Sequence, residues 1–336
     1  MFLKNCWYVA AEASEIGRKP FGRILLGEPV VLYRKEDGTA VALEDRCCHR
    51  RAPLHRGKLV GDALQCGYHG FTFAADGACI KVPGFDRLPF KEAGVRAYPL
   101  VERHRYLWIW MGEAAKADPS KIHDFHENDD AGWASTTGVI PVAANYLLLV
   151  DNLLDLSHVG FVHGSTIGSD DSSATLEFEK GDRTLKVTRA ARNIDMPPHM
   201  RRLGIADKGD MVKLITFTPG SNISIDIIWG GAGGPLAHIM VINSITPETE
   251  DSSHYFWGNA RDFDVKNEKL TAYFREQTLI AFHEDKDILE AQQKNIALDP
   301  DTPEISVHGD WGGVQARRLM GELITAENSR RGLAAE

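Results

Sequence analysis

The sequence predicts an α+β protein in two parts: a small all-β domain, followed by a larger domain that combines strands with long helices. Short apolar runs fill the first third of the chain and are separated by turn residues such as Glu36-Asp37-Gly38 and Asp76-Gly77. A helical pattern follows at about residues 145–163, and the last 70 or so residues return to helix. We therefore expect two domains, residues 1–115 and 116–336.

The bulk composition favours a globular protein and excludes several classes of function. With 336 residues, 43% of them hydrophobic, the chain can bury two cores. The formal net charge of -9 argues against a nucleic-acid partner. We find no apolar run of about 18 residues and no signal-peptide pattern, so we expect neither a membrane span nor export. A cytoplasmic protein would keep its five cysteines as thiols or metal ligands.

The individual elements can be placed by their hydrophobic patterns. Strands are expected in the first domain at residues 23–34, 39–45, 71–82 and 106–112. A polar connector with Pro119 spans residues 113–135. In the second domain, strands are expected at 184–192, 223–231, 237–246 and 252–263, and helices at 145–163, 267–298 and 312–331.

The most specific motif is a pair of short loops, each with one cysteine and one histidine. The ligand types follow the pattern C-x-H-x16-C-x2-H, formed by Cys47, His49, Cys66 and His69. Structural zinc also accepts two cysteines and two histidines, but zinc fingers usually pair cysteine with cysteine and histidine with histidine. In a Rieske [2Fe–2S] centre, two cysteines hold one iron and two histidines hold the other. A Rieske cluster is therefore favoured over zinc and over four incidental residues.

A second group of polar residues lies in the helical pattern of the larger domain. Asn152, Asp155 and His158 are spaced i, i+3, i+6 and would share one face of a continuous helix. His163 can reach the same metal as His158 only if the helix ends or distorts between them, which Gly160 allows. Two histidines and one carboxylate form the facial triad of mononuclear iron(II) oxygenases. The alternative is an amphipathic helix with incidental histidines.

The carboxylate of such a triad must come from another segment. Glu284, Asp285 and Asp287 lie together in the predicted helix 267–298 and are the candidates. Asp155 has a separate expected role, because a carboxylate one helical turn before His158 can accept its free ring N–H and fix the ring.

Several stretches of the chain resemble a known family. The segment EDRCCHRRAPLHRGKLVGDALQCGYHG resembles the Rieske loops of ring-hydroxylating oxygenases. The segments NCWYVAA, LLLVDNLLDLSHVGFVH, ITPETEDSSHYFWGNARDF and GGVQARRLM are similar to the vanillate O-demethylase and dicamba monooxygenase group. Two positions depart from the family pattern: Cys48 stands where proline is usual and leaves a spare thiol near the cluster, and Arg51 stands where glycine is frequent.

The resemblance implies a fold, a ligand set and an assembly. It implies a Rieske domain followed by a helix-grip (START-like) catalytic domain, with a curved antiparallel sheet around a long helix. Among the three acids it selects Asp285 as the ligand that joins His158 and His163 on iron(II). It places Asp155 on the electron route from His69 of one chain to His158 of the next in a head-to-tail homotrimer. Asp155 and Asn152 are the expected catalytic residues.

The resemblance also implies a terminal oxygenase that uses O2. The expected reaction is O-demethylation of a methoxylated aromatic acid such as vanillate, with release of formaldehyde. Alternatives are monooxygenation of a ring methyl or N-methyl group on another aromatic acid or sulfonate, or a Rieske electron carrier without oxygenase activity. No G-x-G-x-x-G motif follows a strand. NAD(P)H electrons should therefore come through a separate reductase with flavin and a ferredoxin-type cluster.

The substrate contacts are the least determined part of the site. The strands that lead to ITPETE should line the pocket in this family, and Asn243, His238 and Trp257 are the candidates for orienting an aromatic acid. Asn243 stands where the dicamba enzyme has histidine, so the resemblance does not extend to recognition of that herbicide.

Overall fold

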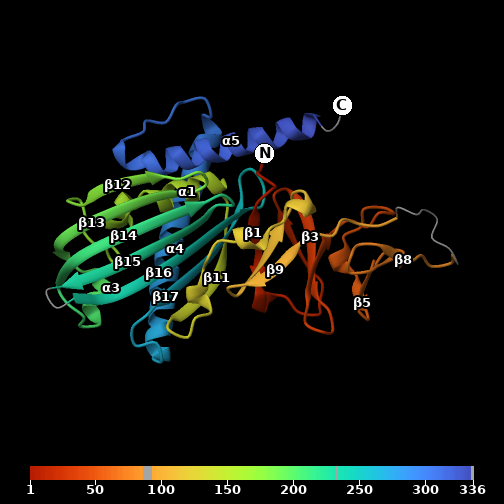
Figure 1. Cartoon of the computed structure of the whole chain (residues 1–336), viewed down its shortest axis with the longest axis horizontal. Coiled ribbons are helices and arrows are strands. Elements are labelled where there is room, and N and C mark those ends of the chain that lie inside the picture. Colours follow the sequence, from red (N-terminus) through yellow and green to blue (C-terminus); the bar gives the residue numbers. More distant parts are fainter. Residues whose placement is uncertain (86–92, 232–233, 334–336) are drawn as a thin grey trace. The chain divides into compact units, whose positions relative to one another are not determined.

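The computed structural model describes residues 1–85, 93–231 and 234–333, which form two compact units. One unit holds Phe2–Ile122 together with Thr246–Thr249, and the other holds Met1, His123–Ile245 and Glu250–Glu336. The first unit contains strands and short 3₁₀ turns, and the second combines a large sheet with helices (Figure 1). The predicted α+β class, an all-β domain before an α+β domain, is confirmed.

The first unit is built from three small antiparallel sheets. Their strand orders are β1-β10-β9, β2-β3-β4 and β5-β6-β7-β8. The strands are β1 Trp7–Glu12, β2 Phe21–Leu25, β3 Glu28–Arg34, β4 Ala40–Glu44, β5 Lys58–Val60, β6 Ala63–Gln65, β7 Thr72–Phe73, β8 Cys79–Lys81, β9 Leu100–Arg103 and β10 Tyr106–Trp110. The cysteine–histidine loops follow β4 and β6, so two neighbouring sheets supply them.

The second unit contains one seven-stranded antiparallel sheet. Its strand order is β11-β17-β16-β15-β14-β13-β12. The strands are β11 Ala134–Val142, β12 Thr175–Lys180, β13 Leu185–Asp195, β14 Lys208–Thr218, β15 Asn222–Gly231, β16 Gly234–Pro247 and β17 Ser253–Arg261. Figure 1 shows the strands curving across the long helix α4, Glu268–Leu298. In β14 the side chains alternate strictly between buried and less buried, as expected of a sheet with one covered face.

Helix α4 supplies the buried surface that covers this face. Its N-cap is Asn267, whose side chain accepts a hydrogen bond from the Leu270 amide. Its buried residues recur every three or four positions, as expected of one face of a helix. The other helices are α1 Tyr146–Leu154, α2 Val159–Val162, α3 Pro198–Arg202 and α5 Trp311–Leu333. None of the helices described here is long and apolar enough to cross a membrane.

The helix predicted over residues 145–163 is interrupted at Asp155, which corrects the sequence prediction. Asp155 is extended, with φ -121° and ψ 99°, and its carboxylate accepts hydrogen bonds from the Ser157 amide at 2.9 Å and the Ser157 hydroxyl at 3.0 Å. This side-chain cap ends α1 and starts a short 3₁₀ turn, Leu156–His158, that leads into α2. The prediction that Asn152, Asp155 and His158 share one helical face is therefore wrong, and the break lies before Gly160.

Candidate metal centres

The two cysteine–histidine loops have the same backbone hydrogen bonding. The amide of Cys47 donates to the Ala52 carbonyl at 2.9 Å, and the amide of Cys66 donates to the Phe71 carbonyl at 2.8 Å. In return, the carbonyls of Cys47 and Cys66 each accept from the amide four residues further on, at 2.8 and 3.1 Å. The loops 47–52 and 66–71 are therefore two copies of one turn, each fixed at both ends.

The residue that closes each turn lies in the left-handed region. Gly70 has φ +73°, and Arg51 holds the same place in the other loop with φ 58°. Glycine adopts this conformation without a steric cost, whereas an L side chain brings Cβ close to the backbone. Arg51, already noted as a departure from the family pattern, is therefore a strained position in the first loop.

The four side chains form an inner pair and an outer pair. The thiols of Cys47 and Cys66 lie in a buried core cluster, and each residue is 3% exposed. The rings of His49 and His69 are exposed and lie with centroids 4.7 Å apart, and His49 stacks on Phe71 at 4.8 Å. Two sulfur donors on the inside and two nitrogen donors at the surface fit the two irons of a Rieske cluster.

The Cys47 thiol needs a nearby cation to be fully deprotonated. Burial raises the pKa of Cys47 to about 12, and the neighbouring Cys66 adds to this increase. A thiolate ligand must be deprotonated, so bound iron would supply the positive charge that this environment lacks. Cys48 has a different setting, because its side chain is exposed beside the pair.

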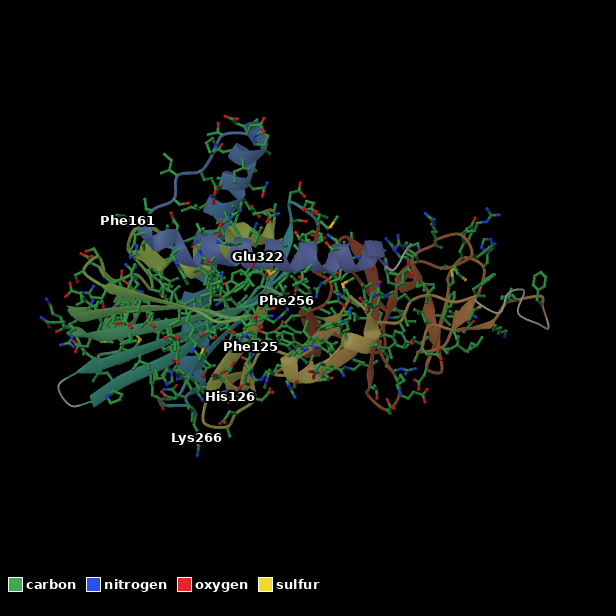
Figure 2. All side chains as sticks on the ribbon, turned by 45° about the horizontal axis from the view of Figure 1, so that its top comes forward. Phe125, His126, Phe161, Phe256, Lys266 and Glu322 are labelled. Carbon is green, nitrogen blue, oxygen red and sulfur yellow. The ribbon has the colours of Figure 1, made fainter. Side chains whose placement is uncertain are left out.

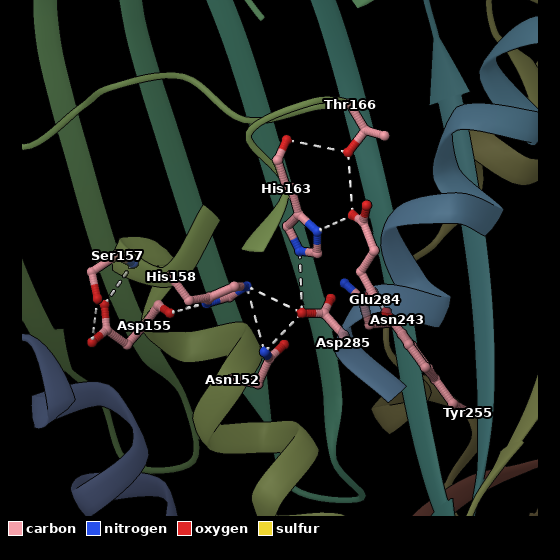
Figure 3. A network of polar contacts seen from close by, with 10 residues as sticks. All are labelled: Asn152, Asp155, Ser157, His158, His163, Thr166, Asn243, Tyr255, Glu284 and Asp285. Carbon is pink, nitrogen blue, oxygen red and sulfur yellow. Dashed lines mark hydrogen bonds and ion pairs between the residues drawn. The ribbon is translucent and has the colours of Figure 1, made fainter. Parts of the chain in front are cut away.

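Three side chains from separate segments meet in the second unit. His158 ends the 3₁₀ turn, His163 caps α2 at its C-terminus, and Asp285 lies on the buried face of α4. Asp285 Oδ1 is 3.1 Å from His163 Nε2 and 3.4 Å from His158 Nε2 (Figure 3). One ligand atom from each residue lies within 4.8 Å of the others, so the three could hold one metal ion.

The other ring nitrogen of each histidine is held by a second group. His158 Nδ1 lies 2.8 Å from the Asp155 backbone carbonyl, and His163 Nδ1 lies 2.7 Å from Glu284 Oε2. Such partners fix the tautomer and leave Nε2 free for a metal. The expected partner of His158 was the Asp155 carboxylate, and this detail is wrong, because Ser157 occupies that carboxylate.

The environments of the two rings differ in charge. Burial lowers the pKa of His158, although Asp285 and the Asp155 carbonyl oppose the shift. Burial also disfavours the charged form of His163, but the contacts with Asp285 and Glu284 outweigh it and raise the pKa. The protonated ring is therefore disfavoured at His158 and favoured at His163, which lies next to both carboxylates.

The remaining predicted residues separate into those at this site and those outside it. The Asn152 amide donates to Asp285 Oδ1 at 3.1 Å and lies 3.4 Å from His158 Nε2. Glu284 contacts His163 on the side away from Asp285, and Asp287 lies on an open surface groove of α4. Of the three candidate acids, Asp285 alone points between the two histidines (Figure 3).

A cavity of about 100 Å³ opens beside the three residues. Most of its wall is apolar, from α1, the segment that follows it, the sheet and α4: Leu153, Leu156, Val159, Ile167, Pro197, Ile225, Ile227, Trp229, Ile239, Val241, Phe274 and Phe282. Asn152, His158, His163 and Asp285 border the cavity directly. Phe161 of α2 does not border the cavity, and its side chain is 91% exposed (Figure 2).

The three residues expected to orient the substrate do not line this cavity. Asn243 is buried further along β16, where Tyr255 donates to its Oδ1 at 2.6 Å (Figure 3). His238 has the opposite strand parity to Ile239 and Val241 and pairs with Asp226.

Trp257 packs at the position of Gly138 on β11, where a Cβ would come within 2.6 Å of its ring. The Trp257 ring also lies 5.8 Å from Phe282, so it supports the wall from behind.

Sequence reasoning missed a group of charged residues in the cavity wall. Lys213 borders the cavity and contacts Asp171, which in turn contacts Arg189. The signal was a charged residue at an inward position of a strand, among Met211, Ile215 and Phe217 in β14. It was not found because β14 itself was not among the predicted strands.

Comparison with known proteins agrees with the fold. Residues 6–99 match the Rieske [2Fe-2S] domain, and residues 142–326 match the vanillate O-demethylase oxygenase C-terminal domain. The toluene-4-sulfonate monooxygenase system iron-sulfur subunit of Comamonas testosteroni is 40% identical, covering 98% of this chain and 99% of the relative. The vanillate O-demethylase oxygenase subunit of a Pseudomonas species is 37% identical, with 97% and 96% covered.

Solved structures of dicamba monooxygenase are also similar to this chain. The complex with 3,6-dichlorosalicylic acid has a TM-score of 0.92 at 34% identity, covering 97% of this chain and 99% of the other. The complex with non-heme iron and dicamba has a TM-score of 0.84 at 32% identity, with 98% and 99% covered.

The fold and the two sites define a two-domain iron-dependent oxygenase. The chain belongs to the Rieske oxygenase family with the vanillate O-demethylase type of catalytic domain. The predicted family, fold class and enzyme class are thereby confirmed, as are the [2Fe–2S] cluster, the mononuclear iron and the use of O2. Electrons come from a separate reductase component.

Proposed function

We propose that this chain is the terminal oxygenase of a multicomponent monooxygenase that oxidises a methyl carbon on an anionic aromatic substrate. The observation that carries the proposal is the meeting of His158, His163 and Asp285 at the edge of a mostly apolar cavity. Two imidazoles and one carboxylate would hold an iron(II) ion, which would supply the oxidation chemistry with dioxygen. The apolar wall holds the ring and excludes water from the reacting carbon.

The ligand assignments belong to the same proposal. Cys47 and Cys66 would hold one iron of the cluster, and His49 and His69 would hold the other. The exposed histidine rings leave this side of the site accessible to an electron-transfer partner. Glu284 and the Asp155 carbonyl keep the two iron-binding rings in place. Asn152 donates to the Asp285 oxygen that faces both histidines, which fixes the carboxylate orientation.

The assembly and the electron route are proposed from the family resemblance. A head-to-tail homotrimer would bring His69 of one chain to Asp155 of the next, and Asp155 already holds His158 through its carbonyl. The reductase would carry flavin and a ferredoxin-type cluster. The molar mass in solution tests the trimer. The rate of electron transfer in an Asp155→Asn variant tests the electron route.

Our first substrate candidate is a methoxylated aromatic acid such as vanillate, which would be converted to a phenol and formaldehyde. It is supported by the match of residues 142–326 to the vanillate O-demethylase domain and by 37% identity to such an enzyme. The second candidate is hydroxylation of the ring methyl of an aromatic sulfonate. The 40% identity to the toluene-4-sulfonate monooxygenase subunit supports it.

Product analysis decides between the two candidates. The purified holoenzyme, a surrogate reductase and NADH would be incubated with vanillate or with 4-toluenesulfonate. Stoichiometric formaldehyde from vanillate supports the demethylase, and a benzyl alcohol from 4-toluenesulfonate supports the second reaction. Reduction of the cluster without substrate-dependent O2 consumption for either compound would contradict the proposal and favour an electron carrier.

A further inference from the structure

Two cations lie side by side on the covered face of the sheet. Arg189 on β13 and Lys213 on β14 are directly opposite each other in the antiparallel register. Both are buried, 7% and 5% exposed, and their strand neighbours on the same face are apolar. Like charges at directly opposed positions destabilise a sheet, so the pair requires a compensating group.

Asp171 provides that group, but it carries only one negative charge. Its Oδ2 accepts hydrogen bonds from Arg189 Nε at 2.8 Å and from Lys213 Nζ at 3.1 Å. Its Oδ1 accepts a hydrogen bond from Arg189 Nη2 at 2.8 Å. Burial opposes its ionisation, but the contacts with Arg189 and Lys213 hold the pKa of Asp171 below its ordinary value. Taken by themselves, Arg189, Lys213 and Asp171 carry one net positive charge, and the Asp155 carboxylate acts on the Arg189 side of the group.

Lys213 is the member of this group that can bind a ligand in the cavity. It borders the cavity, whereas Arg189 and Asp171 do not. An ammonium has three donors, and within the described residues Lys213 Nζ donates to Asp171 alone. Its next neighbour across the sheet, Ile227, continues the apolar wall. A negative group bound here would be attracted by the ammonium charge and would accept hydrogen bonds from its remaining N–H donors.

Two further polar atoms in the same cavity are buried without a partner among the described residues. They are His199 Nδ1 and Gln277 Oε1. Burial lowers the pKa of His199 to about 4, so its ring is neutral and its Nδ1 can donate or accept. Buried polar atoms normally have partners, so a ligand with polar substituents is expected to fill this space.

We propose that Lys213 is the anion-binding residue of the substrate cavity and holds the carboxylate or sulfonate of the aromatic substrate. This inference rests on the proposed function and specifies where the acidic group binds. The ring then lies along the wall of Ile227, Ile239 and Trp229, and the methyl-bearing end points toward the iron-binding residues. Arg189 and Asp171 position the ammonium without touching the substrate.

The test measures binding without turnover, using a charged compound and its neutral isostere. Anaerobic calorimetry on the holoenzyme would compare 4-methoxybenzoate with 4-methoxybenzamide, and 4-toluenesulfonate with 4-toluenesulfonamide. In Lys213→Met, the Kd of the acids should rise about 10- to 100-fold, the size of a lost charge-assisted hydrogen bond, while the amides change less than about threefold. Lys213→Arg should keep most of the preference for the acids.

Lys208→Met is the matched control, because Lys208 lies on the same strand with an exposed side chain. The cluster absorbance and circular dichroism of each variant would verify its fold. Equal loss of acid and amide binding, unchanged acid binding in Lys213→Met, or no binding of either acid to the unaltered enzyme would overturn the subsite. Formaldehyde or alcohol formation is measured separately, so failure of the proposed reaction and failure of the subsite are distinguishable.

Discussion

Replacing Asp171 with asparagine should destabilise the catalytic domain strongly. Arg189 Nε and Lys213 Nζ both contact Asp171 Oδ2, at 2.8 and 3.1 Å, so the two nitrogens are at most about 6 Å apart. At an effective dielectric constant of about 20, two like charges at that distance repel by about 3 kcal/mol, and in the variant the Asp171 carboxylate no longer offsets this repulsion. With the hydrogen bonds also lost, we expect a decrease of about 3–5 kcal/mol in the free energy of unfolding.

The pH dependence of this change has a defined sign. The folded pKa of Asp171 lies below its unfolded value, so its contribution is fully present above that value and is lost as the pH falls through the folded pKa. Burial lowers the pKa of Lys213, although Asp171 opposes the shift. In Asp171→Asn the opposing charge is gone, so the penalty for the charged lysine grows. The variant should regain stability as the pH rises from neutral toward the unfolded lysine pKa.

Urea unfolding followed by tryptophan fluorescence measures both effects, because Trp229 lies in the same cavity wall. The double variant Asp171→Asn/Lys213→Met should recover part of the loss, since one of the two cations is removed. A loss below about 1 kcal/mol in Asp171→Asn would refute the reasoning, because it would mean that water already screens the three charges.

Two further substitutions test the metal loops and the iron ligands. Arg51→Gly should stabilise the first loop by up to about 1 kcal/mol, because it removes the positive-φ strain. Arg50→Gly is the control and should not stabilise the loop. Urea unfolding compares the two variants, and equal effects on the free energy of unfolding would contradict the strain argument. Glu284→Gln should weaken binding of the mononuclear iron by about 10- to 100-fold, because His163 loses the charged partner of Nδ1. Iron retained during dialysis against a chelator measures this, with Asp287→Asn as the control, and equal retention in both variants would refute the assignment.

The ligand loops could be predicted from the sequence because their information is local. Cys47, His49, Cys66 and His69 lie in two short turns, and the residue types alone define the donor set. Helix α4 was also predicted almost to its observed ends, because its apolar period is long and regular.

The break after α1 and the substrate wall could not be predicted in the same way. The helical period continues through Asp155, and only the competition between its carboxylate and the helix hydrogen bonds ends α1. The partner of Lys213 lies 42 residues away in the chain, so no local pattern links it to Asp171. Asn243 lies on the same strand as cavity residues, but whether it reaches the cavity depends on the packing of Tyr255.

The most direct test of the account is the iron and acid-labile sulfide content of anaerobically purified protein and of its Asp285→Asn variant. The account predicts about three irons and two sulfides per chain in the unaltered protein, and about two of each in the variant, because only the mononuclear site uses Asp285. The visible absorbance of the cluster should be the same in both. Zinc without sulfide, or an iron content that Asp285→Asn does not change after iron reconstitution, would contradict it.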